Sequence, residues 1–210
     1  MQGFLKSTKT FRYSTIGNPE TAKTIIYVLH GYGQLSDYFI RKFENLQNDY
    51  FIVAPEGMHR FYLKGSSGRV GASWMTKEDR DNDISDNLNW LNQLADELAT
   101  KHQFEKTILL GFSQGGATAL RWFHKSRIKI DQLIIWAAVF PPDLIVKEEL
   151  VNSNSRNRFF VIGNNDEFYS ENQRTEIIDY YNSAGFISSI YDGNHDIDLE
   201  TLKSLLNSTN

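Results

Sequence analysis

Apolar residues along the chain gather in short continuous runs, and between the runs they recur every three or four positions. The continuous runs are rich in β-branched and aromatic residues, which is typical of strands covered on both faces. They span residues 24–29, 50–54, 108–110, 133–138 and 159–163, and a last strand is predicted over residues 187–191. A weaker alternation over residues 8–14 predicts an edge strand.

Helical spacing fills most of the intervals. The clearest stripe has apolar side chains every third or fourth residue after an aspartate-rich start: Ile84, Leu88, Leu91, Leu94, Ala95 and Leu98. Further helices are predicted over 36–46, 171–183 and 197–206, and one through Ala117, Leu120 and Phe123. Strands that alternate with helices predict an α/β fold with a mostly parallel sheet and helices on both faces, in a single domain over residues 1–210.

The stretch 56–80 breaks this pattern. It holds glycines, serines, basic residues and scattered aromatic side chains without a strand or helix period. We expect a long loop there, and long loops inside a small domain are often functional.

The segment Gly111-Phe112-Ser113-Gln114-Gly115 lies between a predicted strand and a predicted helix. In that context G-x-S-x-G predicts a sharp turn that presents the serine hydroxyl at the tip of the strand. The flanking glycines leave room, since a Cβ there would collide with the strand or helix. The helix N-terminus behind the serine favours a developing negative charge. We therefore expect Ser113 to be a nucleophile rather than an ordinary turn serine.

An acid and a histidine follow Ser113 in the chain, each directly after a predicted strand. Asp166 follows the run 159–163, and His195 follows the run 187–191. The carboxyl ends of parallel strands meet at one edge of a sheet, so these side chains are expected to lie together. His195 would take the Ser113 proton and return it to the leaving group, while Asp166 would hold the imidazole tautomer.

Other residues compete for these two roles. Asp143 also follows a strand and is the second choice for the acid. The remaining competitors are acids that can cap a turn or helix, and histidines that precede Ser113 or lie near helix ends: Asp192, Asp196, Asp198, His30, His59, His102 and His124.

An oxyanion formed at Ser113 needs two backbone N–H donors. One is expected from Gln114, whose amide is free because it opens a helix. The other is expected from Tyr32 in the glycine turn His30-Gly31-Tyr32-Gly33, which follows the first buried strand.

Composition narrows the function classes. The 210 residues carry a net charge of −4, which gives no electrostatic basis for binding nucleic acid or an anionic membrane. There is no cysteine, so disulfides and thiolate chemistry are excluded, and no H-x-x-x-H pair favours a metal. No signal-peptide core or membrane-length apolar run occurs, so a cytoplasmic location without membrane insertion is expected. We expect no cofactor, a small-molecule substrate and, as an open question, a homodimer.

Four motifs resemble the carboxylesterase/phospholipase family: Leu29-His30-Gly31-Tyr32-Gly33, Gly111-Phe112-Ser113-Gln114-Gly115-Gly116, Gly163-x-x-Asp166 and Gly193-Asn194-His195. That family holds small bacterial carboxylesterases, lysophospholipase-like enzymes and acyl-protein thioesterases. The resemblance implies an α/β-hydrolase domain without a large cap, a Ser113–His195–Asp166 triad and an oxyanion hole at Tyr32 and Gln114. It also implies a place for Trp74 near an acyl pocket.

The chain departs from the family pattern at the acid. Members commonly read Gly-x-x-Asp-Pro-x-Val-Pro, whereas Asp166 is followed here by Glu167-Phe168-Tyr169, and Asp196 and Asp198 crowd His195. Substrate identity therefore does not carry over from the family.

We expect a cofactor-free serine hydrolase that cleaves carboxylic esters of short or medium acyl chains through an acyl-enzyme. The alternatives are a lysophospholipase or acyl-thioester hydrolase and, from another class, a non-catalytic binding protein on a hydrolase fold. Shorter chains are favoured because the 56–80 stretch offers few apolar side chains to meet a long one, with Trp74 as the expected acyl-side wall.

Overall fold

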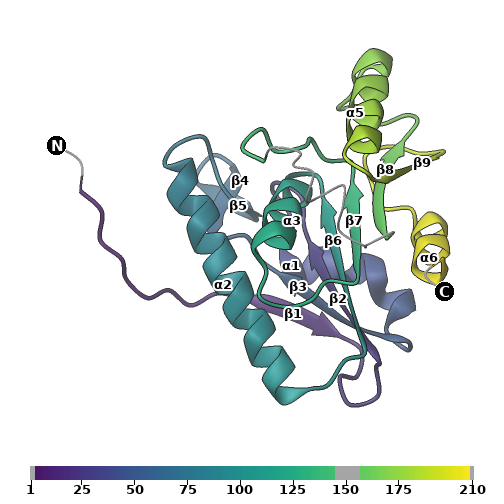
Figure 1. Ribbon diagram of the computed structural model, residues 1–210. Coiled ribbons are helices and arrows are strands. Elements are labelled where there is room, and N and C mark those ends of the chain that lie inside the picture. The colour runs from purple at the N-terminus through teal and green to yellow at the C-terminus, as the bar shows by residue number, and fades with distance from the viewer. Residues whose placement is uncertain (1–2, 145–156, 209–210) are drawn as a thin grey trace.

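A mostly parallel sheet runs through the centre of the molecule (Figure 1). The computed structural model describes residues 3–144 and 157–208. Within them the sheet has seven strands in the order β1-β3-β2-β6-β7-β8-β9, and only β1 pairs antiparallel to its neighbour. The strands are β1 (Tyr13–Ile16), β2 (Thr24–Leu29), β3 (Tyr50–Pro55), β6 (Lys106–Phe112), β7 (Gln132–Trp136), β8 (Arg158–Gly163) and β9 (Ile187–Tyr191).

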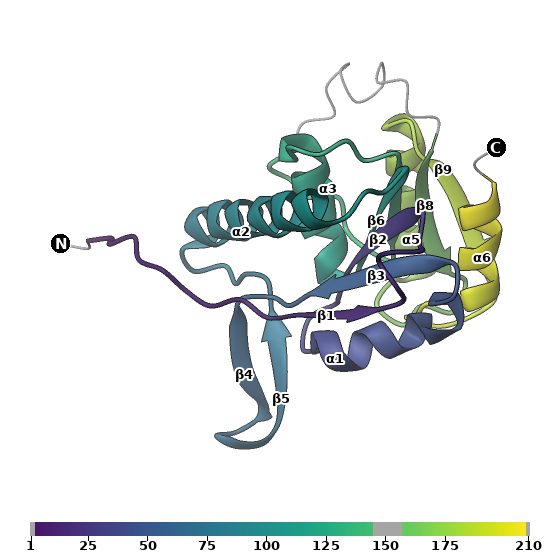
Figure 2. The ribbon, with the colours of Figure 1, turned by 90° about the horizontal axis from the view of Figure 1, so that it is seen from below.

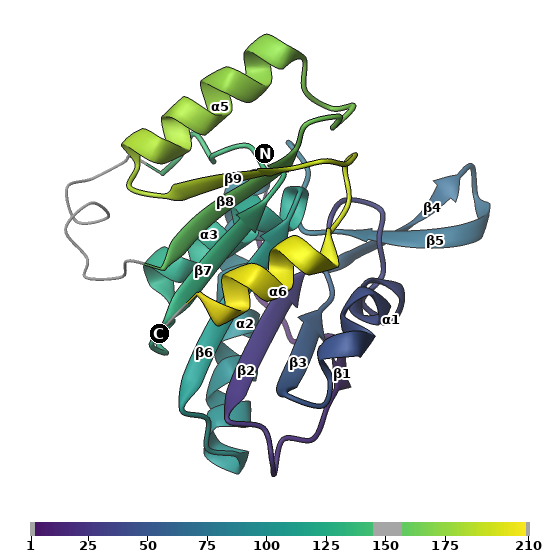
Figure 3. The same cartoon turned by 90° about the vertical axis from the view of Figure 1, so that its right-hand side faces the viewer.

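Helices cover both faces of this sheet (Figure 3). One face carries α2 (Arg80–Lys101), α3 (Gln114–Lys125) and α5 (Glu171–Ser183). The other carries α1 (Ser36–Phe39), the 3-10 helix η1 (Ile40–Leu46) and α6 (Leu199–Asn207). The predicted α/β fold is confirmed. No helix within the described residues has both the length and the apolar character to cross a membrane.

The core consists of two apolar layers that share the same strands. Ile25 and Tyr27 of β2 pack into the layer under α2 and α3, while Ile26 and Val28 pack into the layer under α1, η1 and α6. Successive strand residues point to opposite faces, so a strand buried on both faces must be apolar throughout. This is why the central strands were visible as continuous runs.

The prediction of a long loop over residues 56–80 is wrong for most of that stretch. It contains an antiparallel hairpin of β4 (His59–Lys64) and β5 (Ser67–Ser73), which extends away from the sheet (Figure 2). The hairpin lies outside the two apolar layers, so its strands need no core-facing side chains and show no regular period. At its base, Ala72 and the segment Gly33–Gln34 exchange backbone hydrogen bonds of 2.8 and 3.1 Å.

The edge strand is shorter and later than predicted. β1 begins at Tyr13 rather than at Thr8, with Tyr13 opposite Pro55, the last residue of β3. One further backbone bond follows, in which the Glu56 amide donates to the Arg12 carbonyl at 3.1 Å. Of the described residues before Arg12, which are 3–11, none pairs with a strand.

Candidate active site

Ser113 occupies the turn between β6 and α3. Its backbone has φ 53° and ψ −122°, a left-handed region that L-residues rarely adopt. Its amide donates to the Trp136 carbonyl at 2.8 Å, which anchors the turn to β7. A Cβ at Gly115 would lie 2.3 Å from the Leu29 carbonyl oxygen, so only glycine fits there.

Asp166 and His195 form the contact that the chain order predicted. His195 Nδ1 lies 2.7 Å from Asp166 Oδ2, and the Asp166 side chain is fully buried. The other carboxylate oxygen accepts the Phe168 amide at 3.0 Å. The two loops are also joined by a backbone bond from Asn165 to Gly193 at 3.0 Å. The carboxylate is thus held toward one nitrogen of the imidazole, which leaves Nε2 for a substrate or nucleophile.

Aromatic rings hold His195 beside the serine turn. The imidazole centroid lies 4.9 Å from the ring of Phe112, the residue before Ser113, and 4.4 Å from the ring of Phe168. The His195 amide also donates to the Glu167 carboxylate at 3.2 Å. Glu167 and Phe168 were not among the residues expected at the site, although both follow Asp166 where the sequence departs from Gly-x-x-Asp-Pro-x-Val-Pro.

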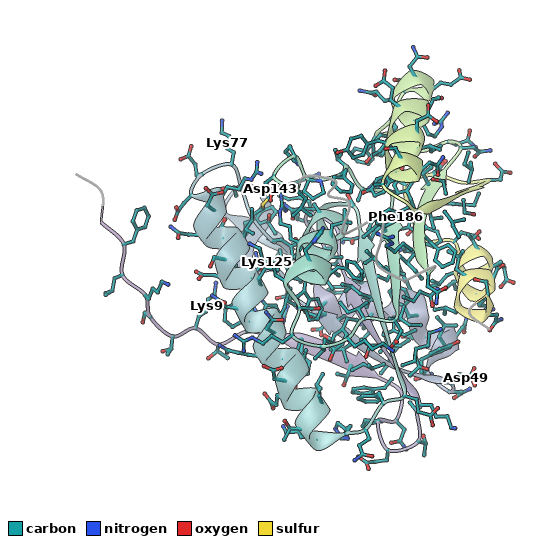
Figure 4. All side chains as sticks on the ribbon, in the orientation of Figure 1. Lys9, Asp49, Lys77, Lys125, Asp143 and Phe186 are labelled. Atoms are coloured by element: carbon teal, nitrogen blue, oxygen red, sulfur yellow. The ribbon has the colours of Figure 1, made fainter. Side chains whose placement is uncertain are left out.

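The second-choice acid is engaged elsewhere. Asp143 lies between α2 and α3 (Figure 4). It binds Arg121 of α3 at 2.6 and 2.8 Å and Arg80 of α2 at 2.7 Å. The hydrogen bond from Arg121 is the main cause that lowers the pKa of Asp143 to about 2. Asp143 therefore balances the charge of the buried Arg121 and does not contact His195.

The remaining competitors also have other partners. Asp192 bonds to Asn165, Asp196 to Lys42 and Asp198 caps α6. His59 lies beside Asp83 and His102 beside Glu20, and His124 is in the last turn of α3.

The glycine turn after β2 lies against Ser113. A Cβ built on Gly31 would be 3.2 Å from the Ser113 Cβ, so the absence of a side chain permits this approach. The Gly31 amide donates to Gln34 Oε1 at 2.9 Å, a contact that sequence analysis missed. The Tyr32 and Gln114 amides donate to no acceptor within residues 3–144 and 157–208.

His30 is a buried, neutral histidine at the end of β2. Its Nε2 accepts the Gly57 amide at 2.9 Å, and its Nδ1 lies 2.7 Å from the Gly31 carbonyl oxygen. Since Nε2 accepts, the proton must be on Nδ1, which donates to Gly31. Burial lowers the pKa of His30 to about 4.

Trp74 occupies an interior position rather than an open one. Its side chain is 0% exposed, its Nε1 donates to the His30 carbonyl at 2.8 Å, and its ring stacks on Trp90. The Gln114 side chain accepts from the Trp74 amide at 3.0 Å. Here Trp74 supports the His30 turn, and its expected role as an acyl-side wall stays a prediction that would need it to become exposed.

The described residues hold no cluster of three or more histidine or acidic side chains that could bind a metal ion. A cavity of about 630 Å³ lies between the α1–η1 segment and strand β5 of the hairpin, lined by residues that include Gln34, Tyr38, Lys42 and Arg69. None of the described residues of the Ser113 turn or of the His195 loop is among its lining residues.

Solved structures share this fold at low sequence identity. An acyl-protein thioesterase 2 from Zea mays has a TM-score of 0.67 and 19% identity, over 92% of this chain and 95% of that one. A phospholipase/carboxylesterase from Dyadobacter fermentans has a TM-score of 0.62 and 18% identity, over 97% and 98%. A protein of unknown function from Agrobacterium tumefaciens has a TM-score of 0.68 and 14% identity, over 95% and 97%.

No curated protein matches the sequence significantly. The model of one protein family, described as phospholipase/carboxylesterase, matches residues 13–210 and so includes every strand described above. The chain therefore belongs to the phospholipase/carboxylesterase family, a family of esterase-type hydrolases.

Proposed function

We propose that this protein is a serine hydrolase that cleaves carboxylic esters through an acyl-enzyme on Ser113. The observation that carries the proposal is the 2.7 Å contact between His195 and the buried Asp166, on a loop that packs against the serine turn. A carboxylate buried against one imidazole nitrogen orients the other nitrogen as a base.

The reaction follows from these positions. His195 Nε2 accepts the Ser113 proton as Oγ attacks the ester carbonyl carbon, and the carbonyl oxygen takes the negative charge. The Tyr32 and Gln114 amides donate to that oxyanion. The C–O bond to the leaving group then breaks, and the imidazolium returns its proton to the leaving alcohol. Water repeats the sequence in the second half, which releases the acid and restores Ser113.

Short or medium acyl chains fit the surroundings of the site best. Two of the large side chains at the site are open, because Tyr32 is 61% and Phe168 68% exposed. Side chains so exposed form a rim and not an enclosed channel. Each methylene of an acyl chain gains about 0.8 kcal/mol only when it is fully buried, so gains should stop after a few carbons.

Thioester hydrolysis is the second candidate. The chemistry at Ser113 is the same, and the likeness to the maize acyl-protein thioesterase supports it. Matched p-nitrophenyl and thiophenyl esters of one acyl group would rank the two substrate classes by kcat/KM.

The nucleophile is tested by covalent labelling. A fluorophosphonate should lose fluoride and form a phosphorus–oxygen bond to Ser113, with mass added to the peptide that contains it. Ser113→Ala should abolish labelling and lower kcat by about 10⁴–10⁶-fold, since the triad acts as a unit. Ser67→Ala, at an exposed serine on the hairpin, is the matched control and should keep full activity. Labelling of another serine would assign the nucleophile to that residue instead of Ser113.

The acyl preference is tested with p-nitrophenyl esters from acetate to palmitate. We expect kcat/KM to rise over the first few carbons and then to level off or fall. A steady rise to palmitate would favour the lysophospholipase alternative.

A further inference from the structure

A buried histidine that the proposed reaction does not use lies directly behind the glycine turn. The His30 ring is inaccessible to solvent and packs between Trp74, at 5.1 Å, and Phe39, at 6.4 Å. Its Nε2 is occupied by the Gly57 amide, so it has no free nitrogen with which to act as a base.

We infer that His30 is a positioning residue: its Nδ1–H fixes the orientation of the Gly31–Tyr32 peptide and so directs the Tyr32 amide toward the oxyanion. The inference rests on the proposed function, because only an oxyanion at Ser113 gives that amide a role.

The link between the His30 Nδ1–H and the Tyr32 amide is the geometry of one peptide group. The hydrogen bond from Nδ1, at 2.7 Å, ends on the Gly31 carbonyl oxygen. That carbonyl and the Tyr32 N–H belong to the same planar peptide, in which C=O and N–H point in opposite directions. When the carbonyl points inward to His30, the N–H must point outward. A Cβ built on Gly31 would lie 3.2 Å from the Ser113 Cβ, so this peptide lies beside the nucleophile, and the inference directs the outward N–H toward the reacting atoms.

A glycine turn needs such a restraint. Gly31 has no side chain to limit rotation of its peptide, and a small rotation would move the Tyr32 N–H away from the oxyanion. The Gln34 amide gives the same carbonyl a weaker bond of 3.3 Å. Without His30 the peptide is therefore expected to be loosely held rather than free.

Neighbouring groups hold both the backbone and the ring of His30. Trp74 Nε1 binds the His30 carbonyl at 2.8 Å. The Gly57 amide, which sets the tautomer, follows Glu56, whose buried carboxylate accepts the Ser36 amide at 3.1 Å and Arg60 at 2.6 Å. Desolvation opposes the charge on Glu56, but its bonds to Arg12, Arg60 and Ser36 together hold its pKa below the usual range. These contacts fix the position of Gly57. Its amide donates to Nε2, which keeps the proton of the ring on Nδ1.

Two amide variants separate the two nitrogens of His30. The Asn side-chain amide is as far along the side chain as Nδ1, so His30→Asn can still donate to the Gly31 carbonyl while it loses the bond to Gly57. The Gln amide matches Nε2, so His30→Gln can still accept from Gly57 but offers no donor to Gly31. Each variant breaks one buried bond of the same ring, so each is the control for the other.

Activity is measured well below the lower of the two melting temperatures. Complete loss of an oxyanion donor lowers kcat by about 10²–10³-fold. In His30→Gln the Tyr32 amide is still present but wrongly oriented, so kcat should fall by about 10–100-fold while KM stays nearly unchanged. Its affinity for a trifluoromethyl ketone, which adds Ser113 to form a charged hemiketal, should fall by the same factor. Affinity for the carboxylic acid product should not fall. His30→Asn should keep kcat within about 5-fold of the wild type.

The outcomes distinguish the inference from its premise. Equal kcat in the two variants, or losses that follow only their melting temperatures, would make His30 a packing residue and overturn the inference. An active Ser113→Ala would instead overturn the proposed function. If both variants fail to fold, the ¹⁵N shifts of His30 in the wild type still decide: a proton on Nδ1 supports the inference, and a proton on Nε2 contradicts it.

Discussion

Desolvation of the buried His30 ring lowers its pKa to about 4, whereas a histidine in the unfolded chain titrates near 6.5. At a pH between these two pKa values, His30 is protonated in the unfolded chain but not in the folded protein. The stability is therefore full above about pH 6.5 and declines as the pH falls toward 4. The difference between the two pKa values corresponds to about 3 kcal/mol as an upper limit.

Urea unfolding at pH 7.5, 5.5 and 4.5 measures this dependence. As the pH is lowered, the free energy of unfolding should fall more steeply in the wild type than in His30→Asn, which has no titrating ring at this position. Equal slopes in the two proteins would mean that His30 titrates normally when folded.

The two candidate acids should respond differently to loss of charge. Asp166→Asn should lower kcat by about 10³–10⁴-fold, because the amide can stabilise the wrong tautomer of His195. Asp143→Asn should leave kcat within a few fold but lower the melting temperature, because Arg121 is buried and loses its counter-charge. Steady-state kinetics and thermal melts of both variants check this. A collapse of kcat in Asp143→Asn alone would reverse the assignment.

At the scale of elements, the hairpin and the glycine turn form one unit. The β5 end of the hairpin bonds through Ala72 to Gly33 and Gln34, the first and second residues after Tyr32. A Cβ at Gly71 would lie 2.3 Å from the Gly33 carbonyl oxygen, so Gly71→Ala must push the hairpin and the turn apart.

We expect Gly71→Ala to lower kcat about 10-fold or more, with a smaller loss in melting temperature than a core substitution causes. Ser66→Ala, at the exposed hairpin turn, is the control and should match the wild type. Unchanged kcat in Gly71→Ala would show that the turn is fixed independently of the hairpin.

Burial decides which elements could be predicted from the sequence. β2, β6, β7 and β8 face apolar layers on both sides, so each reads as an uninterrupted apolar run. β4 and β5 are held by cross-strand hydrogen bonds outside those layers, and hydrogen bonding leaves no apolar period in the sequence. The same division applies at the site. Asp166 and His195 could be placed by strand order, whereas the bonds of Gln34 and Glu167 depend on contacts between loops.

At the scale of the whole molecule, the two apolar layers cannot separate, because neighbouring residues of one strand supply both. Ile134 packs into the layer under α6, and Ile135 packs into the layer under α3, both with no exposed surface. Ile134→Ala and Ile135→Ala should each lower the free energy of unfolding by about 2–5 kcal/mol.

Each variant should still unfold in one transition, with coincident urea curves from far-ultraviolet circular dichroism and tryptophan fluorescence. Three tryptophans lie in the layer of Ile135 and Trp136 lies in the other, so fluorescence reports on both. An intermediate in Ile134→Ala alone would mean that one layer survives without the other.

The hairpin tip offers a site for engineering because of how its base is attached. Its link to the glycine turn is made by backbone groups at Ala72, while a Cβ added to Gly65 or Gly68 near the tip would meet no atom within 4 Å. The turn at Gly65–Ser66 therefore has open space beside it. A peptide tag, a fluorophore or a binding loop inserted at Gly65–Ser66 should be tolerated and would be displayed next to the site without a change in its chemistry.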